Sequence, residues 1–328
     1  MKTNLHNTAL QYPFPYGANP HSAIVEKKVF EWLETEYNFL PVKVKAKYRN
    51  TGIGHAGGCM FPQASLTQLT TICRFFIWAF TVDDSYEFTD KKTVYDFQKK
   101  AMIALEEGIL STEEALLLPL RTLRAELLRM GSTKWVERFY KNLQLYFEGL
   151  KEETTWRKSL VFPSFDEYEP IRIHSVNVYP LVNFAEAITG SELPESIYQH
   201  PSMQKIARLT CRILSWANDL FSAHLEKGKD VLNLVLIMEN TNQCSLEDAF
   251  KQGVQIHDRD VSEFILLTDN LPSFGIYDTI ARKYIENLQL MISGYLHWTL
   301  TLTERYGSSG HPSNEFISQI ENSYGNPD

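Results

Sequence analysis

The 328-residue sequence predicts one all-α domain of about ten or more helices. Three observations support this prediction. Apolar residues recur at helical spacing along most of the chain, no strand–helix alternation indicates βαβ units, and no Pro/Ser-rich linker divides the chain. We therefore expect a single helical core between residues 23 and 306, preceded by an arm (1–22) and followed by a polar, mobile tail (307–328).

The elements follow in order. The first helix is predicted over residues 23–36, where Val25, Val29 and Leu33 share one face. Pro163 and Pro170 are expected to bracket a connector. Further helices are predicted over 64–88, 93–108, 112–130, 133–157, 171–189, 202–226, 230–241, 245–253, 259–271 and 276–306.

Two early segments differ from this pattern. Residues 42–48 alternate like a strand but have no second strand to pair with, and residues 50–62 resemble a loop before Pro62. The stretch Gly52–Gly57 matches GxGxxG. A lone match without a βαβ unit is weak evidence for a dinucleotide site, and we set it aside.

The composition excludes several classes of protein. Hydrophobic residues make up 44% and charged residues 22%, as in ordinary globular proteins. The net charge of −8 argues against nucleic-acid binding and against an anionic membrane as partner. We expect no stable membrane insertion, because no apolar run reaches about 18 residues. Four cysteines without a CxxC pair and an N-terminus unlike a signal peptide favour a reduced, cytoplasmic setting.

The strongest chemical signal is the acidic end of the apolar helix over 64–88. Asp83, Asp84 and Glu87 are three or four positions apart, so they share one helix face. Clustered carboxylates repel one another, and a divalent cation would relieve that repulsion. Oxygen ligands of this kind suit Mg²⁺. Taken alone, the pattern is equally compatible with a solvated helix end.

A second polar stripe lies on the helix over 202–226. Asn218, Ser222 and Glu226 recur every four residues on an otherwise apolar helix. An amide oxygen, a hydroxyl and a carboxylate also suit Mg²⁺. Two such stripes far apart in sequence predict a metal cluster between facing helices, which could neutralise a pyrophosphate.

These motifs resemble those of class I terpene synthases of the bacterial type. That family carries an aspartate-rich motif after an apolar helix, and a triad of the form NDxxSxxxE. Both are present here, at Asp83–Glu87 and Asn218–Glu226. Arg172 stands 46 positions before Asn218, where the family has a diphosphate-sensing Arg. The family also has an Arg–Tyr pair near the C-terminal end of the last long helix, and Arg305 and Tyr306 stand there, at the end of the helix predicted over 276–306. The resemblance covers roughly residues 20 to 306.

The sequence departs from the family pattern at two positions. Leu225 stands where Lys or Arg often contacts diphosphate, and the next basic residue is Lys227. One residue turns a helix by about 100°, so Lys227 cannot simply replace it, although we keep it as a candidate contact. Val176, preceded by Ser175, stands where the family often has a Gly at a helix break.

The resemblance implies a class I terpenoid synthase-like bundle around a central apolar cavity, and a linear isoprenyl diphosphate as substrate. It implies Mg²⁺, with three ions per active site, held by Asp83, Asp84, Glu87, Asn218, Ser222 and Glu226. Arg172, Lys227, Arg305 and Tyr306 would bind the diphosphate. Residues assigned to the cavity lining are Phe76, Phe80, Phe147, Ser175, Val176, Trp216 and Trp298. Each of these aromatic side chains could equally be ordinary core packing.

The implied reaction is ionisation of the substrate, followed by cyclisation of the carbocation to a cyclic terpene hydrocarbon or alcohol. Farnesyl diphosphate is favoured as substrate and geranylgeranyl diphosphate is second. The arm, with Phe14 and Tyr16, is a candidate active-site cover, and a homodimer is a further expectation by analogy. A chain-elongating prenyl diphosphate synthase and a non-catalytic isoprenoid-binding protein remain the alternatives.

Overall fold

The computed structural model describes residues 10–110, 114–307 and 310, and in these residues it contains helices and no strand. The prediction of an all-α fold is therefore confirmed. The first half comprises α1 (Ser22–Thr35), α2 (Val42–Thr51), α3 (Ile53–Met60), α4 (Leu66–Tyr86), α5 (Lys91–Glu106), the 3₁₀ helix η1 (Ala115–Leu117), α6 (Leu120–Met130) and α7 (Thr133–Ser159). The second half comprises α8 (Phe165–Ser175), α9 (Tyr179–Ala187), α10 (Glu195–Tyr198), α11 (Pro201–Glu226), α12 (Leu234–Asn242), α13 (Leu246–Asp269), the 3₁₀ helix η2 (Gly275–Tyr277) and α14 (Asp278–Thr301).

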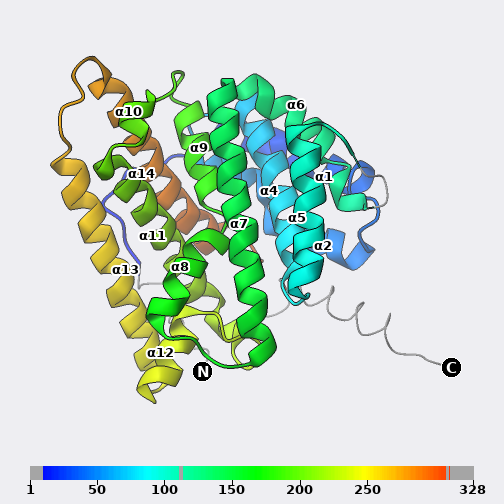
Figure 1. The fold of residues 1–328 in the computed structure, drawn as a ribbon, viewed down its shortest axis with the longest axis vertical. Coiled ribbons are helices and arrows are strands. Elements are labelled where there is room, and N and C mark those ends of the chain that lie inside the picture. Colours follow the sequence, from blue (N-terminus) through cyan, green and yellow to red (C-terminus); the bar gives the residue numbers. More distant parts are fainter. Residues whose placement is uncertain (1–9, 111–113, 308–309, 311–328) are drawn as a thin grey trace.

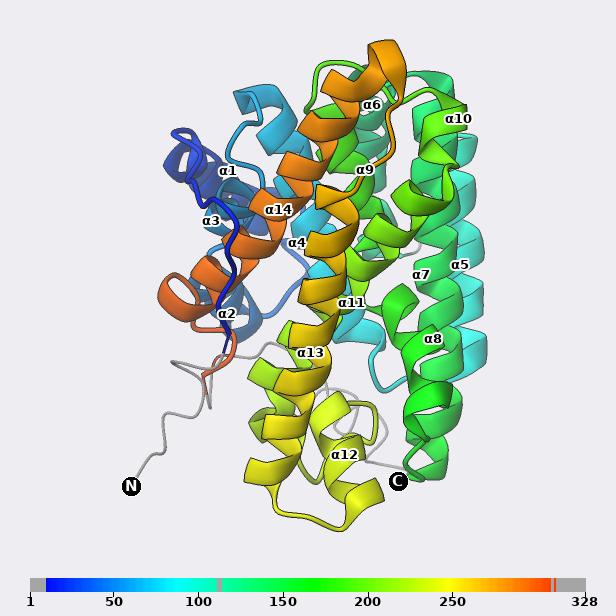
Figure 2. The same ribbon diagram turned by 90° about the vertical axis from the view of Figure 1, so that its left-hand side faces the viewer.

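The long helices form the frame of the molecule (Figures 1 and 2). Helices α5 and α7 run side by side, while α11 packs against α13 and α14 packs against α3. Their inward faces are apolar because core residues recur every three or four positions, and the result is one continuous core. None of the helices that the structure describes is long and apolar enough to cross a membrane.

Several predicted boundaries were wrong. Residues 42–51 form α2 rather than a strand: Val44 and Tyr48, four apart, are fully buried while Val42 is exposed, which is helical and not alternating burial. The two helices predicted over 245–253 and 259–271 are a single helix, α13 (Leu246–Asp269). The predicted helix 171–189 is two helices, and Pro170 lies inside α8 rather than in a connector. Finally, α14 ends at Thr301.

The glycine-rich stretch after Gly52 is helix α3, not a loop. Gly52 adopts a left-handed conformation (φ 68°) and separates α2 from α3. The glycines of α3 allow close packing, because a side chain at Gly54 would lie 2.5 Å from the backbone nitrogen of Glu26 in α1. From α14, Gly294 in turn packs against the backbone of Cys59. The GxGxxG match therefore reflects close helix packing.

The described part of the N-terminal arm packs outside the bundle. Tyr12 shares a 2.8 Å hydrogen bond with His257 Nε2, and Phe14 contacts Phe264, both on α13. Tyr16 contacts His297 on α14. Residues 1–9, to which the predicted cover also extends, and most of the predicted tail lie outside the described residues.

We expect Gly294→Ala to lower the free energy of unfolding by about 2 kcal/mol, because the added methyl meets the Cys59 carbonyl, a backbone group that cannot move freely. Urea unfolding followed by circular dichroism measures this effect. Gly253→Ala is the matched control in α13, since its methyl meets only the ends of side chains, the nearest being Leu220 at 3.1 Å. Equal stability of the two variants would contradict the packing argument.

Candidate active site

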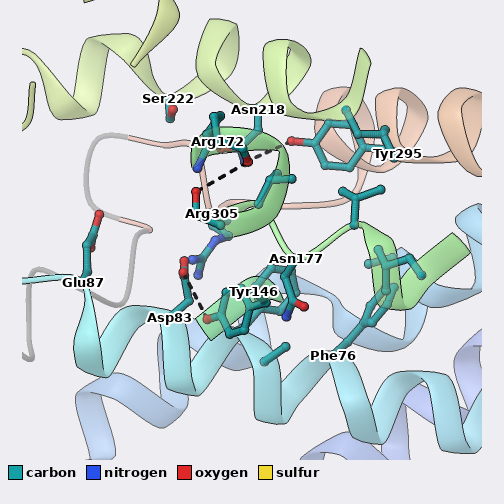
Figure 3. Close-up of a pocket in the computed structure, with 18 of the residues that line it drawn as sticks. Phe76, Asp83, Glu87, Tyr146, Arg172, Asn177, Asn218, Ser222, Tyr295 and Arg305 are labelled. Atoms are coloured by element: carbon teal, nitrogen blue, oxygen red, sulfur yellow. Dashed lines mark hydrogen bonds between the residues drawn. The ribbon is translucent and has the colours of Figure 1, made fainter. Parts of the chain in front are cut away.

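A pocket opens among α4, α7, α8, α11 and α14 (Figure 3). One end is polar: five carboxylates and three guanidinium groups line it. The carboxylates belong to Asp83, Glu87, Glu153, Glu226 and Asp230, and the guanidinium groups to Arg157, Arg172 and Arg305. The other end is apolar and is lined by side chains that include Phe75, Phe76, Ala79, Leu181 and Leu214.

The acidic end of α4 contributes two of its three predicted ligands to the pocket. Asp83 lies opposite Tyr146, whose hydroxyl is 3.5 Å from Asp83 Oδ1 (Figure 3). Burial, and then the nearby Asp84 and Glu153, raise the pKa of Asp83 to about 6. Burial likewise raises the pKa of Glu87 well above its ordinary value.

Asp84 faces the other way. Its carboxylate accepts two hydrogen bonds from Arg305, at 3.1 and 2.7 Å, and one from the Tyr48 hydroxyl at 2.6 Å. It is buried and does not line the pocket. This corrects the prediction of Asp84 as a metal ligand: adjacent helix residues point about 100° apart, and Asp84 positions Arg305 instead.

All three residues of the triad line the pocket from α11. The side chain of Asn233, which caps α12, holds two of them: its amide donates to Glu226 Oε2 at 2.9 Å and to Ser222 Oγ at 3.3 Å. Burial, followed by the nearby Asp230 and Asp219, raises the pKa of Glu226 to about 7. The carboxylate therefore lies where a positive charge would stabilise its ionised form.

Arg172 is coupled directly to the triad. Its Nη2 donates to Asn218 Oδ1 at 2.6 Å and lies 2.8 Å from Asp219 Oδ1. Asn218 in turn donates to the hydroxyl of Tyr306 at 2.8 Å and to that of Tyr295 at 3.3 Å. The predicted residues Arg172, Asn218 and Tyr306 therefore meet in one hydrogen-bonded group.

The helix break after Arg172 forms without glycine. Helix α8 ends at Ser175, the amide of Val176 donates to the Arg172 carbonyl at 3.0 Å, and Asn177 has a φ of 61°. Both Ser175 and Val176 line the pocket. Glycine is found instead on the neighbouring helix: a side chain at Gly149 would lie 2.6 Å from the Ser175 nitrogen, so the close contact of α7 with the break requires it.

Arg305 and Tyr306 follow the end of α14 and both line the pocket. The Arg305 guanidinium lies 4.8 Å from the centre of the Phe80 ring, a cation–π contact. Trp298 lines the pocket and donates from Nε1 to the Thr51 carbonyl at 3.0 Å. This connects the end of α14 to α2.

Arg157 is the main residue that the sequence motifs did not indicate. From α7 it donates to the Glu87 carbonyl at 2.9 Å, to Glu153 at 2.8 Å and to Asp230 at 2.8 Å, and so bridges the α4 side and the α11 side of the pocket. No motif spacing marks it, because an Arg four positions after a Glu is common on helices. Tyr146, Glu153 and Tyr295 also line the pocket, and no motif spacing in the sequence marks them.

Three cavity and diphosphate assignments require correction. Phe147 packs against Trp78 and Phe97 in the core between α4, α5 and α7, and the adjacent Tyr146 faces the pocket instead. Trp216 lies on the face of α11 opposite to the pocket, where its Nε1 donates to Asp260 at 2.7 Å. Lys227 lies beyond the end of α11, paired with Glu239 and away from the pocket lining. Phe76, Phe80 and Trp298 do line the pocket.

The comparisons with known proteins agree with this geometry. The sequence profile described as "Terpene synthase family 2, C-terminal metal binding" matches residues 74–263, more than half of the chain. The chain belongs to this terpene synthase family. It is 29% identical over 326 residues to a (+)-T-muurolol synthase from Roseiflexus castenholzii, covering 96% of this chain and 98% of that protein. It is 28% identical to a germacrene A synthase from Nostoc punctiforme, covering 88% and 92%.

Solved structures confirm the fold of this terpene synthase. The 2-methylisoborneol synthase from Streptomyces coelicolor, in complex with Mg²⁺ and 2-fluoroneryl diphosphate, superposes with a TM-score of 0.81 at 20% identity, covering 92% of this chain and 97% of that one. Germacradien-4-ol synthase from Streptomyces citricolor gives 0.79 at 19%, covering 90% and 98%. The class I terpenoid synthase fold predicted from the motifs is therefore confirmed.

The donor groups of this terpene synthase suit Mg²⁺. In the described chain no three Asp, Glu, His or Cys side chains converge closely enough to hold a metal. The triad would not form such a group, because two of its three oxygens come from Asn218 and Ser222. The carboxylates around the pocket outnumber the guanidinium groups, and burial raises the pKa of Asp83, Glu87 and Glu226. Added divalent cations would offset this excess of negative charge.

We expect Asn233→Ser to raise the Mg²⁺ concentration needed for half-maximal activity by roughly tenfold, because Glu226 and Ser222 lose the amide that orients them. Ser still caps α12, so the fold should be retained. The melting temperature should fall moderately, because the buried amide also donates to the Asp219 carbonyl. Diphosphate release measured across a Mg²⁺ titration, together with thermal unfolding, tests this. An unchanged Mg²⁺ dependence in a folded variant would show that Asn233 does not position the triad.

Proposed function

We propose that this terpene synthase ionises a linear isoprenyl diphosphate with the help of Mg²⁺ and cyclises the resulting carbocation. The observation that carries the proposal is the division of one pocket into a charged end and an apolar end. The charged end suits a diphosphate, and the apolar end suits a hydrocarbon chain. Farnesyl diphosphate is the favoured substrate, since the T-muurolol synthase that matches nearly the whole chain is named for cyclising it. Geranylgeranyl diphosphate is second.

The metal ligands that we propose come from two helices. Asp83 and Glu87 face the pocket from the end of α4, and Asn218, Ser222 and Glu226 face it from α11. Bound Mg²⁺ would neutralise diphosphate and so stabilise it as a leaving group. Three ions would fit the charge of the substrate and of these ligands. Asn218 Oδ1 accepts from Arg172, so Arg172 would have to release it before this oxygen binds a metal.

Guanidinium and hydroxyl groups would hold the diphosphate. Arg172, Arg305 and Tyr306 line the pocket, and Arg157 joins them in place of the basic residue that is missing at Leu225. A guanidinium presents several N–H donors in one plane and matches phosphate oxygens well. Arg305 needs little reordering to accept a ligand, because it is held by Asp84, which also accepts from the Tyr48 hydroxyl.

The apolar end would control the carbocation. Side chains of Phe76, Phe80 and Trp298 line the pocket, and an aromatic face stabilises positive charge without acting as a nucleophile. Apolar walls also exclude water and fold the isoprenoid chain so that a chosen double bond meets the cation.

The catalytic unit would be residues 23–306. A homodimer remains a prediction, which light scattering would test.

We expect the purified protein with Mg²⁺ to convert one of geranyl, farnesyl and geranylgeranyl diphosphate, tested separately, into a cyclic terpene detected by gas chromatography and mass spectrometry. Asp83→Ala and Asn218→Ala should each lower the rate by at least about a hundredfold, since each removes a proposed metal ligand. Lys205→Ala, on the surface, is the control. In a parallel reaction that also contains isopentenyl diphosphate, a longer prenyl diphosphate as product would indicate chain elongation. No diphosphate release would contradict an enzymatic role.

We expect Arg157→Gln to lower kcat/KM by roughly a hundredfold, as for loss of a charged contact to the leaving group. Arg157→Lys keeps the charge opposite Glu153 and Asp230, and should retain more activity and the wild-type fold. Steady-state kinetics and thermal unfolding separate the two effects. If Arg157→Gln folds and retains wild-type kcat/KM, Arg157 does not contact the diphosphate.

A further inference from the structure

A phenylalanine of α4 lies at the apolar end of the pocket. Phe76 lines the pocket and stands seven residues before Asp83, which places the two residues about 10 Å apart along the helix axis. In Figure 3, Glu87, Asp83 and Phe76 follow one another along α4, with Glu87 and Phe76 at opposite sides of the group drawn. The metal ligands and the Phe76 ring therefore face the two ends of one pocket.

Two fully buried rings stand behind Phe76. The ring of Phe61, which follows α3, contacts Phe76 edge-on at a centroid distance of 6.2 Å, and it also contacts Phe184 on α9 at 6.3 Å. Neither Phe61 nor Phe184 lines the pocket. The pocket therefore ends at Phe76, because a packed aromatic layer fills the space beyond it.

The Phe76 ring has little freedom to move aside. It contacts both Phe61 and Phe80 at centroid distances of 6.2 Å, and it is buried. The adjacent pocket residue, Phe75, packs edge-on against Phe184 in the same layer. A close-packed interior admits extra atoms only at a cost in stability. The ring therefore sets a fixed limit on the space available to a hydrocarbon chain.

The size of this ring matches the difference between two candidate substrates. Geranylgeranyl diphosphate is longer than farnesyl diphosphate by one isoprene unit, which has five carbon atoms. Replacing Phe76 by alanine removes a ring of six carbon atoms from the end of the pocket, and the surrounding side chains close such a gap only in part. The space gained would therefore suit about one further isoprene unit.

We propose that Phe76 determines the chain length of the substrate: its ring ends the pocket where a farnesyl chain fits and excludes the further isoprene unit of geranylgeranyl diphosphate. This inference rests on the proposed function, because it requires the diphosphate to bind at the charged end. The far end of the hydrocarbon chain is then directed towards Phe76. A ring at this position selects by its volume, since one extra methylene in a fixed apolar pocket already changes kcat/KM by about tenfold or more.

Steady-state kinetics with farnesyl and with geranylgeranyl diphosphate, followed by diphosphate release in the presence of Mg²⁺, test the proposal. We expect the wild type to have the higher kcat/KM for farnesyl diphosphate. Phe76→Ala should raise the ratio of kcat/KM for geranylgeranyl diphosphate to that for farnesyl diphosphate by at least about tenfold, because the further isoprene unit gains an apolar space. Phe76→Leu removes less volume, so it should keep the fold more securely and shift the ratio in the same direction by a smaller factor.

Two other phenylalanine variants control for a general loosening of the protein. Phe147→Ala removes the same ring from the core outside the pocket, and should lower the melting temperature without changing the ratio. Phe80→Ala removes a ring one turn nearer to Asp83, and should shift the ratio less than Phe76→Ala does.

Three results would overturn the role of Phe76. These are an unchanged ratio in the folded Phe76 variants, an equal shift in Phe80→Ala, and a wild type that prefers a substrate other than farnesyl diphosphate. Absence of diphosphate release by the wild type from geranyl, farnesyl and geranylgeranyl diphosphate alike would instead overturn the proposed function.

Discussion

An excess of buried carboxylates at one end of an apolar pocket is the constraint on which the rest of the site depends. Five carboxylates and three guanidinium groups line the pocket in the described chain. Burial disfavours the ionised acids, so it raises the pKa of Asp83 to about 6 and that of Glu226 to about 7. A protein that keeps such groups loses stability unless it binds positive charge.

The surrounding hydrogen bonds and ion pairs hold these charged groups in place and do not cancel the excess of carboxylates. Asp84, which also accepts from Tyr48, holds Arg305. Asn233 holds Glu226 and Ser222, and Arg157 bridges the α4 and α11 sides of the pocket. The Arg305–Asp84 and Arg157–Asp230 contacts join segments that are distant in sequence, so these contacts stabilise the bundle as well as the site. Close packing of α3 against α1 and α14, which depends on glycine, supports the end of α14 from which Arg305 and Tyr306 extend.

The sequence predicted the site residues that follow a regular helical or motif spacing. The ends of α4 and α11, the triad and the partner at Arg172 follow from helical periodicity and motif spacing, and the structure brings them to one pocket. The sequence could not predict which of two adjacent helix residues faces the pocket. Asp83 faces it while Asp84 points away, and Tyr146 lines it while Phe147 packs in the core. Helix α3 was missed because glycines are typical of loops. In this helix they allow close packing against neighbouring helices.

Calorimetric titration of the protein with inorganic diphosphate, with Mg²⁺ and with a chelator in its place, tests the central claim most directly. If the carboxylates and guanidinium groups form one site completed by metal, Mg²⁺ should tighten diphosphate binding by at least about a hundredfold, because metal and diphosphate each offset the charge that disfavours the other. Asp83→Ala should lose most of that difference. Equal affinity with Mg²⁺ and with chelator would contradict the account.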